Sequence, residues 1–96
     1  MINNISVTDL KKVYDRVNII DLRGIESYNN NHIDGAKNIE FNKLIISPNL
    51  YLDKNLVYYV YCQKGKKSIK LCEILGRQGY KLVNINGGYE AWILNK

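Results

Sequence analysis

The chain has 96 residues and a net charge of +5, with 46% hydrophobic and 24% charged residues, which excludes a disordered chain and predicts a single domain over residues 1–96. Two cysteines and one histidine are too few for a disulfide-stapled scaffold or a structural zinc site. No apolar run is long enough for a membrane span and the first residues do not resemble a signal peptide, so we expect a cytoplasmic protein that does not bind membranes.

The first half of the chain alternates between short helical and extended patterns. Ser6 begins a capping pattern, and the apolar spacing that follows predicts a helix over 6–16. A short β-branched run predicts a strand over 18–22. The later segments predict, in order, a helix over 25–31, a weak strand over 36–39, and a helix over 41–47 that ends before Pro48.

The second half holds the clearest strand, over 56–61. Both of its faces are apolar, which is typical of a central strand in a covered parallel sheet. A helix is predicted over 68–78, with Gly79 as its left-handed cap residue. The residues expected on its inner face are Ile69, Leu71, Cys72 and Leu75. A strand over 82–85, a turn over 86–88 and a helix over 89–94 complete the prediction.

This alternation of strands and helices predicts an α/β fold with three layers, in which helices cover both faces of a central, mainly parallel sheet. Ligands in such folds bind beyond the carboxyl ends of the strands. We therefore expect any chemistry in the loop that follows Tyr61.

That loop has the composition of an anion site built around a cysteine. It reads Cys62-Gln63-Lys64-Gly65-Lys66-Lys67-Ser68. Gly65 permits a tight turn, which can direct backbone N–H groups at the sulfur, and the following helix start and the lysines all favour a thiolate. The alternative interpretation is a buried cysteine at a strand end beside a solvated lysine patch.

The loop also resembles the active-site loop of the rhodanese (sulfurtransferase) homology domain, whose pattern is Cys-x-x-Gly-x-Arg-Ser. Three further segments are similar to family motifs in the same order. They are Asp21-Leu22-Arg23, His32-Ile33-Asp34-Gly35-Ala36-Lys37-Asn38-Ile39 and Gly87-Gly88-Tyr89-Glu90-Ala91-Trp92. The matches extend over residues 21–92, which is most of the chain.

The resemblance implies a three-layer rhodanese-like fold and a persulfide cycle. Cys62 is then the catalytic nucleophile, which takes sulfur from thiosulfate or a persulfide donor and passes it to cyanide, a thiol or a protein. The residues from Gln63 to Ser68 are implied to bind the anion or persulfide. Asp21 is implied to support the loop, and Arg23 to line the pocket rim or pair with an acid such as Glu26. No organic cofactor or metal is implied.

Two positions depart from the family pattern. Lys67 stands where Arg is common, and Gln63 stands where several thiosulfate-using members have a second Arg. Lysine is a point charge without the planar fork of arginine, so we expect thiosulfate to be held less firmly. These departures keep open an alternative function, a low-turnover sulfur-relay or docking module. The loop is one residue shorter than that of related cysteine phosphatases, which disfavours phosphatase activity.

The lysines also bear on macromolecular partners. An acidic protein that donates or accepts sulfur fits the charge near Cys62, because opposite charges steer encounter. Direct nucleic-acid binding is not favoured, since the sequence has no known nucleic-acid motif and no aromatic residues interleaved with the lysines.

The remaining candidates are expected to be structural. Cys72 is expected in the core, the alternative being a resolving cysteine for Cys62. The resemblance implies that His32 stabilises a turn. Tyr89 and Trp92 are expected to pack in the core, and Tyr61 is a strand residue with the alternative of flanking the pocket.

Overall fold

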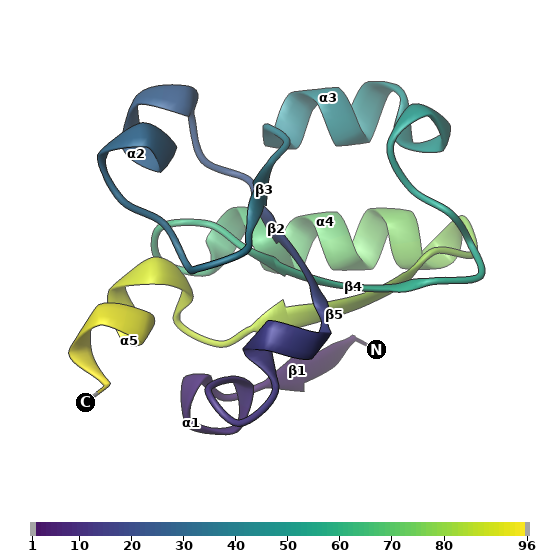
Figure 1. The fold of residues 1–96 in the computed structure, drawn as a ribbon. Coiled ribbons are helices and arrows are strands. Elements are labelled where there is room, and N and C mark those ends of the chain that lie inside the picture. The colour runs from purple at the N-terminus through teal and green to yellow at the C-terminus, as the bar shows by residue number, and fades with distance from the viewer. Residues whose placement is uncertain (1, 96) are drawn as a thin grey trace.

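The computed structural model describes residues 2–95, and a five-stranded parallel sheet forms its centre (Figure 1). The strand order is β1-β5-β4-β2-β3, so β4 is the central strand, as its apolar faces predict. The strands are β1 (Asn3–Ile5), β2 (Asn18–Asp21), β3 (Lys37–Asn38), β4 (Val57–Tyr61) and β5 (Lys81–Ile85). The α-helices are α1 (Val7–Leu10), α2 (Ile25–Asn30), α3 (Phe41–Ile46), α4 (Lys66–Arg77) and α5 (Gly88–Leu94), and two 3₁₀ turns are η1 (Tyr14–Arg16) and η2 (Pro48–Leu50).

Helices cover both faces of the sheet, which confirms the predicted three-layer α/β fold. On one face, α3 and α4 pack over strand residues such as Ile20, Val60 and Leu82. On the other face, α1 and α5 pack over Ile19 and Ile85. Strands buried on both faces need apolar residues at consecutive positions, which explains the paired isoleucines of β2 and the run of valine and tyrosine in β4.

The parallel register places the carboxyl ends of the strands at one edge. Asp21 pairs with Tyr61 of β4 and with Asn38 of β3, and Val60 pairs with Asn84 of β5. The loops that follow β2, β3, β4 and β5 therefore all begin at that edge. No helix among residues 2–95 is long and apolar enough to cross a membrane.

The N-terminal helix prediction was wrong in its length. Ser6 caps α1 by accepting a hydrogen bond from the backbone N–H of Asp9, but α1 ends at Leu10. The φ of Val13 (−133°) lies outside the helical range, and this residue separates α1 from η1. Strand β1 was not predicted, because its Asn3 and Asn4 are exposed and carry little strand pattern.

Helix α4 was correctly identified but begins two residues earlier than expected, at Lys66. Its buried residues are Ser68, Leu71, Cys72 and Leu75, which follow helical spacing. Ile69 was wrongly placed on the inner face and is 41% exposed. Gly79 has a φ of +97°, which confirms its role as the left-handed cap residue.

Candidate active site

Cys62 follows β4 directly, and backbone N–H groups surround its sulfur. The N–H groups of Gly65 and Ser68 donate to Sγ at 3.2 Å and 3.4 Å. Gly65 makes this possible, because its φ of +109° turns the chain sharply into α4. The sulfur thus lies at the N-terminus of a 12-residue helix, where the partial charge is positive.

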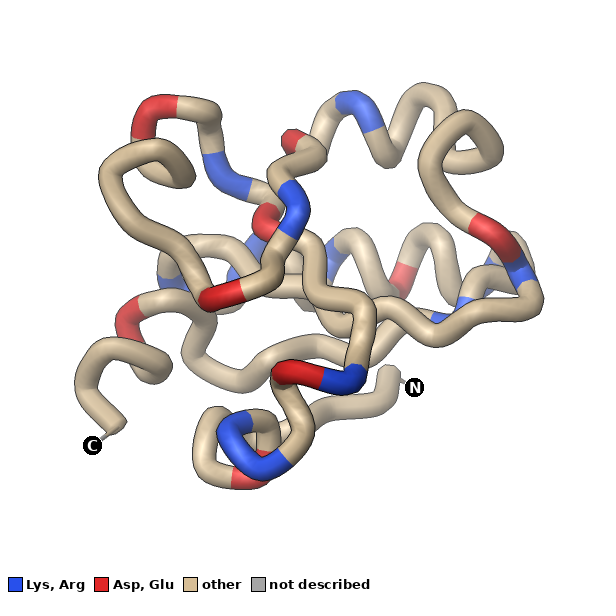
Figure 2. Tube along the Cα trace, in the orientation of Figure 1, with Lys and Arg blue, Asp and Glu red and all other residues tan. Residues whose placement is uncertain are grey.

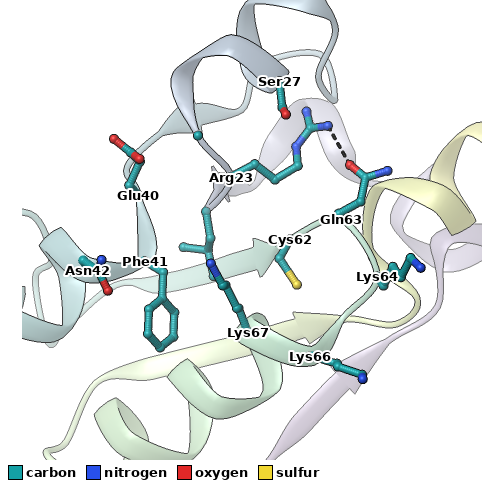
Figure 3. Close-up of a pocket in the computed structure, with 12 residues that line it drawn as sticks. Arg23, Ser27, Glu40, Phe41, Asn42, Cys62, Gln63, Lys64, Lys66 and Lys67 are labelled. Atoms are coloured by element: carbon teal, nitrogen blue, oxygen red, sulfur yellow. Dashed lines mark hydrogen bonds between the residues drawn. The ribbon is translucent and has the colours of Figure 1, made fainter.

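A pocket of about 490 Å³ opens over the sulfur (Figure 3). Cys62 itself is only 5% exposed. Of the residues that the sequence predicts for the site, those that line this pocket with Cys62 are Arg23, Gln63, Lys64, Lys66 and Lys67. In Figure 3, Lys67 lies across the pocket between Cys62 and Phe41, whereas Lys64 and Lys66 point away from the sulfur. Lys64 and Lys66 therefore stand at the rim, whereas Lys67 reaches across the pocket.

Arg23, which lines the pocket, forms an ion pair with the buried Asp21. Asp21 is fully buried, and its Oδ2 lies 2.8 Å from the Nη2 of Arg23. The backbone N–H of Arg23 also donates to Asp21, at 2.8 Å. Arg23 thus pairs with Asp21 and not with Glu26. The Nη1 of Arg23 donates to Oε1 of Gln63 at 3.1 Å, so the ion pair is connected to the Cys62 loop.

Tyr61 belongs to this hydrogen-bond network and not to the pocket. Its side chain is fully buried and its hydroxyl donates to Oδ2 of Asp21 at 2.6 Å. The same hydroxyl accepts a hydrogen bond from the N–H of Ile33. Burial and the hydrogen bond to Asp21 raise the pKa of Tyr61 above its ordinary value. The alternative that Tyr61 flanks the pocket was therefore wrong.

The start of α5 binds the Cys62 loop from the other side. The N–H of Tyr89 donates to the carbonyl oxygen of Cys62 at 2.9 Å, and the N–H of Glu90 donates to that of Gln63 at 3.1 Å. Gly88 allows this approach, since a Cβ there would overlap the Cys62 carbonyl oxygen and lie 2.9 Å from that of Gln63. Gly88 therefore lets α5 position the Cys62 loop, in addition to its part in the turn.

Sequence reasoning missed the far wall of the pocket. It is formed by Leu22, Gly24, Ser27, Glu40, Phe41 and Asn42. A signal for part of this wall was available, because Glu40 and Phe41 follow the predicted strand over 36–39 and so belong at the same sheet edge. Asn84 was also missed, although it is a polar residue inside the apolar pattern of β5.

The other candidates pack against neighbouring side chains and do not line the pocket. Cys72 is buried, and burial, followed by the charge of Glu73, raises its pKa to about 12. His32 lies just beyond the end of α2, where its ring stacks on that of Tyr28 at 3.8 Å and its Nδ1 hydrogen-bonds to the carbonyl oxygen of Tyr28. Trp92 packs edge-on against Tyr14. Among residues 2–95, no three His, Cys, Asp or Glu side chains cluster in a way that could hold a metal.

Comparison with known proteins agrees with this architecture. The model of the rhodanese-like domain family matches residues 6–95. The thiosulfate sulfurtransferase GlpE of Shewanella oneidensis is 37% identical over 78 residues, which cover 79% of this chain and 75% of GlpE. The crystal structure of a rhodanese-like domain protein from Staphylococcus aureus superposes with a TM-score of 0.85 and 32% identity, covering 95% of this chain and 91% of that one.

Some relatives match over only part of their length. The putative sulfurtransferase YtwF of Bacillus subtilis is 44% identical over 41 residues, which cover 43% of this chain. The match spans only 40% of the length of YtwF, so it relates the chain to part of that protein.

Proposed function

The chain belongs to the rhodanese-like domain family, and on that premise we propose that it is a sulfurtransferase that carries sulfur as a persulfide on Cys62. The observation that supports this most directly is the pair of N–H donors at 3.2 Å and 3.4 Å from the sulfur. Such donors at a helix N-terminus favour the thiolate, which is the nucleophilic form of cysteine.

The proposed cycle has two displacement steps. The Cys62 thiolate attacks the outer sulfur of thiosulfate, an S–S bond forms, and sulfite leaves with the electron pair of the broken bond. An acceptor such as cyanide then attacks the terminal sulfur of the persulfide. Thiocyanate forms, and the electron pair of the broken S–S bond returns to Cys62 as thiolate. A small-molecule persulfide enters the same cycle with its thiolate as the leaving group.

The first turn of α4 supplies a site for the terminal sulfur. First-turn N–H groups have no partner within the helix, so those of Lys66 and Lys67 are available to the anion. They hold the negative sulfur as an oxyanion hole holds oxygen. Because the sulfur is carried covalently, the cycle uses no organic cofactor or metal.

The cationic rim favours anionic donors and acceptors, including an acidic protein. Lys64, Lys66 and Lys67 line the pocket and are exposed. Figure 2 shows basic segments gathered at the start of α4. Such a rim steers an acidic partner toward Cys62.

Turnover with two donors tests the proposal. Thiosulfate or a small-molecule persulfide is offered with cyanide, and thiocyanate is measured for the native protein, Cys62→Ser and Cys72→Ser. We expect thiocyanate from the native protein and Cys72→Ser, and none above background from Cys62→Ser. Turnover that survives in Cys62→Ser would reject the assignment of the nucleophile. Absence of turnover with both donors would favour the docking module.

A further inference from the structure

A buried polar pair lies beneath the sulfur, on the side away from the pocket. Ser68 of α4 is fully buried and Asn84 of β5 is 1% exposed. The Oγ of Ser68 is 3.6 Å from the Cys62 sulfur and 2.6 Å from the Oδ1 of Asn84. The pair therefore connects the sulfur to the neighbouring strand, and the cycle proposed above assigns Asn84 no role.

The hydrogen bonds of Asn84 fix the direction of its amide. Its Nδ2 lies 3.0 Å from the Oδ1 of Asn4 and 3.3 Å from the Oδ1 of Asn86, so each amide proton has an acceptor. The carbonyl oxygen is left facing Ser68. An amide oxygen can only accept, so the hydroxyl of Ser68 must donate in this bond.

The Ser68 hydroxyl has one proton to donate, and three groups lie near it: the Cys62 sulfur, the Gly65 carbonyl oxygen and the Asn84 Oδ1. The carbonyl oxygen of Gly65 is a second acceptor at 3.1 Å, but the Asn84 oxygen is closer. With its proton on Asn84, Ser68 presents lone pairs to the sulfur. Lone pairs suit a thiol, which donates its S–H to Ser68, and they repel a thiolate.

We propose that Asn84 is a positioning residue that holds the Ser68 proton away from Cys62 and thereby favours the resting thiol. The thiolate gains the Ser68 hydroxyl as a donor only when that hydroxyl turns away from Asn84. This pair thus opposes the two backbone N–H donors, which favour the thiolate. The proposal rests on the proposed function of Cys62 and adds a control on its ionisation.

The charged residues around the sulfur keep their charges when Asn84 is replaced. They are Lys64, Lys66 and Lys67 of the loop and α4, Arg23 after β2, and Glu40 before α3. Arg23 is held by Asp21. A change at Asn84 alters none of these charges, so its effect on Cys62 must pass through Ser68.

Alkylation of Cys62 by iodoacetamide, a neutral reagent, provides the test at pH 7. Asn84→Leu has a similar branched shape and removes the closer acceptor, which leaves the Ser68 hydroxyl free to turn toward the sulfur. Asn4 and Asn86 are exposed and can bond water in its place. We expect alkylation about fivefold faster than in the native protein, the effect of one additional hydrogen bond. Asn84→Ala, which also lacks the acceptor, serves as the second variant.

A double-mutant comparison distinguishes positioning from general loosening. In a Ser68→Ala background, Asn84→Leu should leave the alkylation rate unchanged, because the hydroxyl that carries the effect is absent. In a Ser68→Thr background, which keeps a hydroxyl, the acceleration should return. An unchanged or slower rate in both Asn84 variants, or an acceleration that persists with Ser68→Ala, would overturn the proposal. Alkylation needs no sulfur donor, so this result is independent of whether the protein transfers sulfur.

Discussion

At the scale of single residues, Cys62 owes its environment more to backbone atoms than to lysines. Two N–H groups contact its sulfur within 3.4 Å, whereas Lys64, Lys66 and Lys67 line the pocket as exposed residues. Exposed charges are screened by water and salt, but buried hydrogen bonds are screened much less. The lysines therefore affect how a sulfur donor binds, and the backbone N–H groups supply the hydrogen bonds to the sulfur.

Lys67→Arg tests the contribution of the rim to donor choice. An arginine fork offers two parallel hydrogen bonds to the oxygens of thiosulfate, where lysine offers a point charge. We expect the KM for thiosulfate to fall about fivefold, the effect of roughly one added hydrogen bond, with kcat little changed. Lys70→Arg is the matched control, since Lys70 is exposed on the same helix and does not line the pocket. Equal effects of the two variants would contradict a specific role for position 67.

At the scale of elements, the start of α5 binds the Cys62 loop through backbone hydrogen bonds. Tyr89 and Glu90 donate to the carbonyl oxygens of Cys62 and Gln63, and Gly88 permits the close approach. The opposite side of the loop is bound by Arg23 through Gln63. The geometry around the sulfur therefore depends on the start of α5 and on Arg23, neither of which donates a hydrogen bond to the sulfur.

Gly88→Ala should disturb this contact. The new Cβ overlaps the Cys62 carbonyl oxygen, and the φ of +62° is one that alanine rarely adopts. We expect a loss of about 1–3 kcal/mol in unfolding free energy from the backbone alone, together with a loss of sulfur transfer. Gly35→Ala is the control, because Gly35 also has a positive φ (+84°) but its Cβ would meet nothing within 4 Å. Urea unfolding and turnover separate the two effects. Retained turnover in Gly88→Ala would show that the contact does not position the loop.

The elements also show what the sequence could predict. Strands with apolar residues on both faces, such as β4, and helices with a regular inner face, such as α4, were located within about two residues. The predicted helix over 6–16 was too long, and β1 was missed, because short edge elements are stabilised by their neighbours more than by their own pattern. The contact between Asn84 of β5 and Ser68 could likewise not be predicted, because it depends on how the helix packs on the sheet.

At the scale of the whole molecule, the parallel sheet assembles the pocket from distant segments. Leu22, Phe41 and Cys62 follow β2, β3 and β4, and they meet because these strands end at one edge. The order of strands and helices predicted the Cys62 loop, and the resemblance to the rhodanese domain implied the Asp21–Arg23 segment. It could not predict how the start of α3 folds over the sulfur, since that depends on helix packing.

Buried titratable groups should make the fold weaker at high pH. Burial raises the pKa of Cys72 from about 9 to about 12, and raises that of Tyr61 as well. The folded state then holds these protons more tightly than the unfolded chain. Stability is therefore full below pH 9 and falls as the pH rises toward 12. We expect Cys72→Val to reduce the slope of unfolding free energy against pH in this window, measured by urea titration. An identical slope in the variant would contradict the assignment to Cys72.

The measurement that tests the central claim most directly is the intact mass of the protein after incubation with thiosulfate, and separately with a small-molecule persulfide. The native protein, Cys62→Ser and Cys72→Ser are compared. The account predicts that the native protein and Cys72→Ser gain one sulfur atom, that a reductant removes it, and that Cys62→Ser gains none. A sulfur atom that still appears in Cys62→Ser, or no gain from either donor, would contradict a persulfide cycle on Cys62.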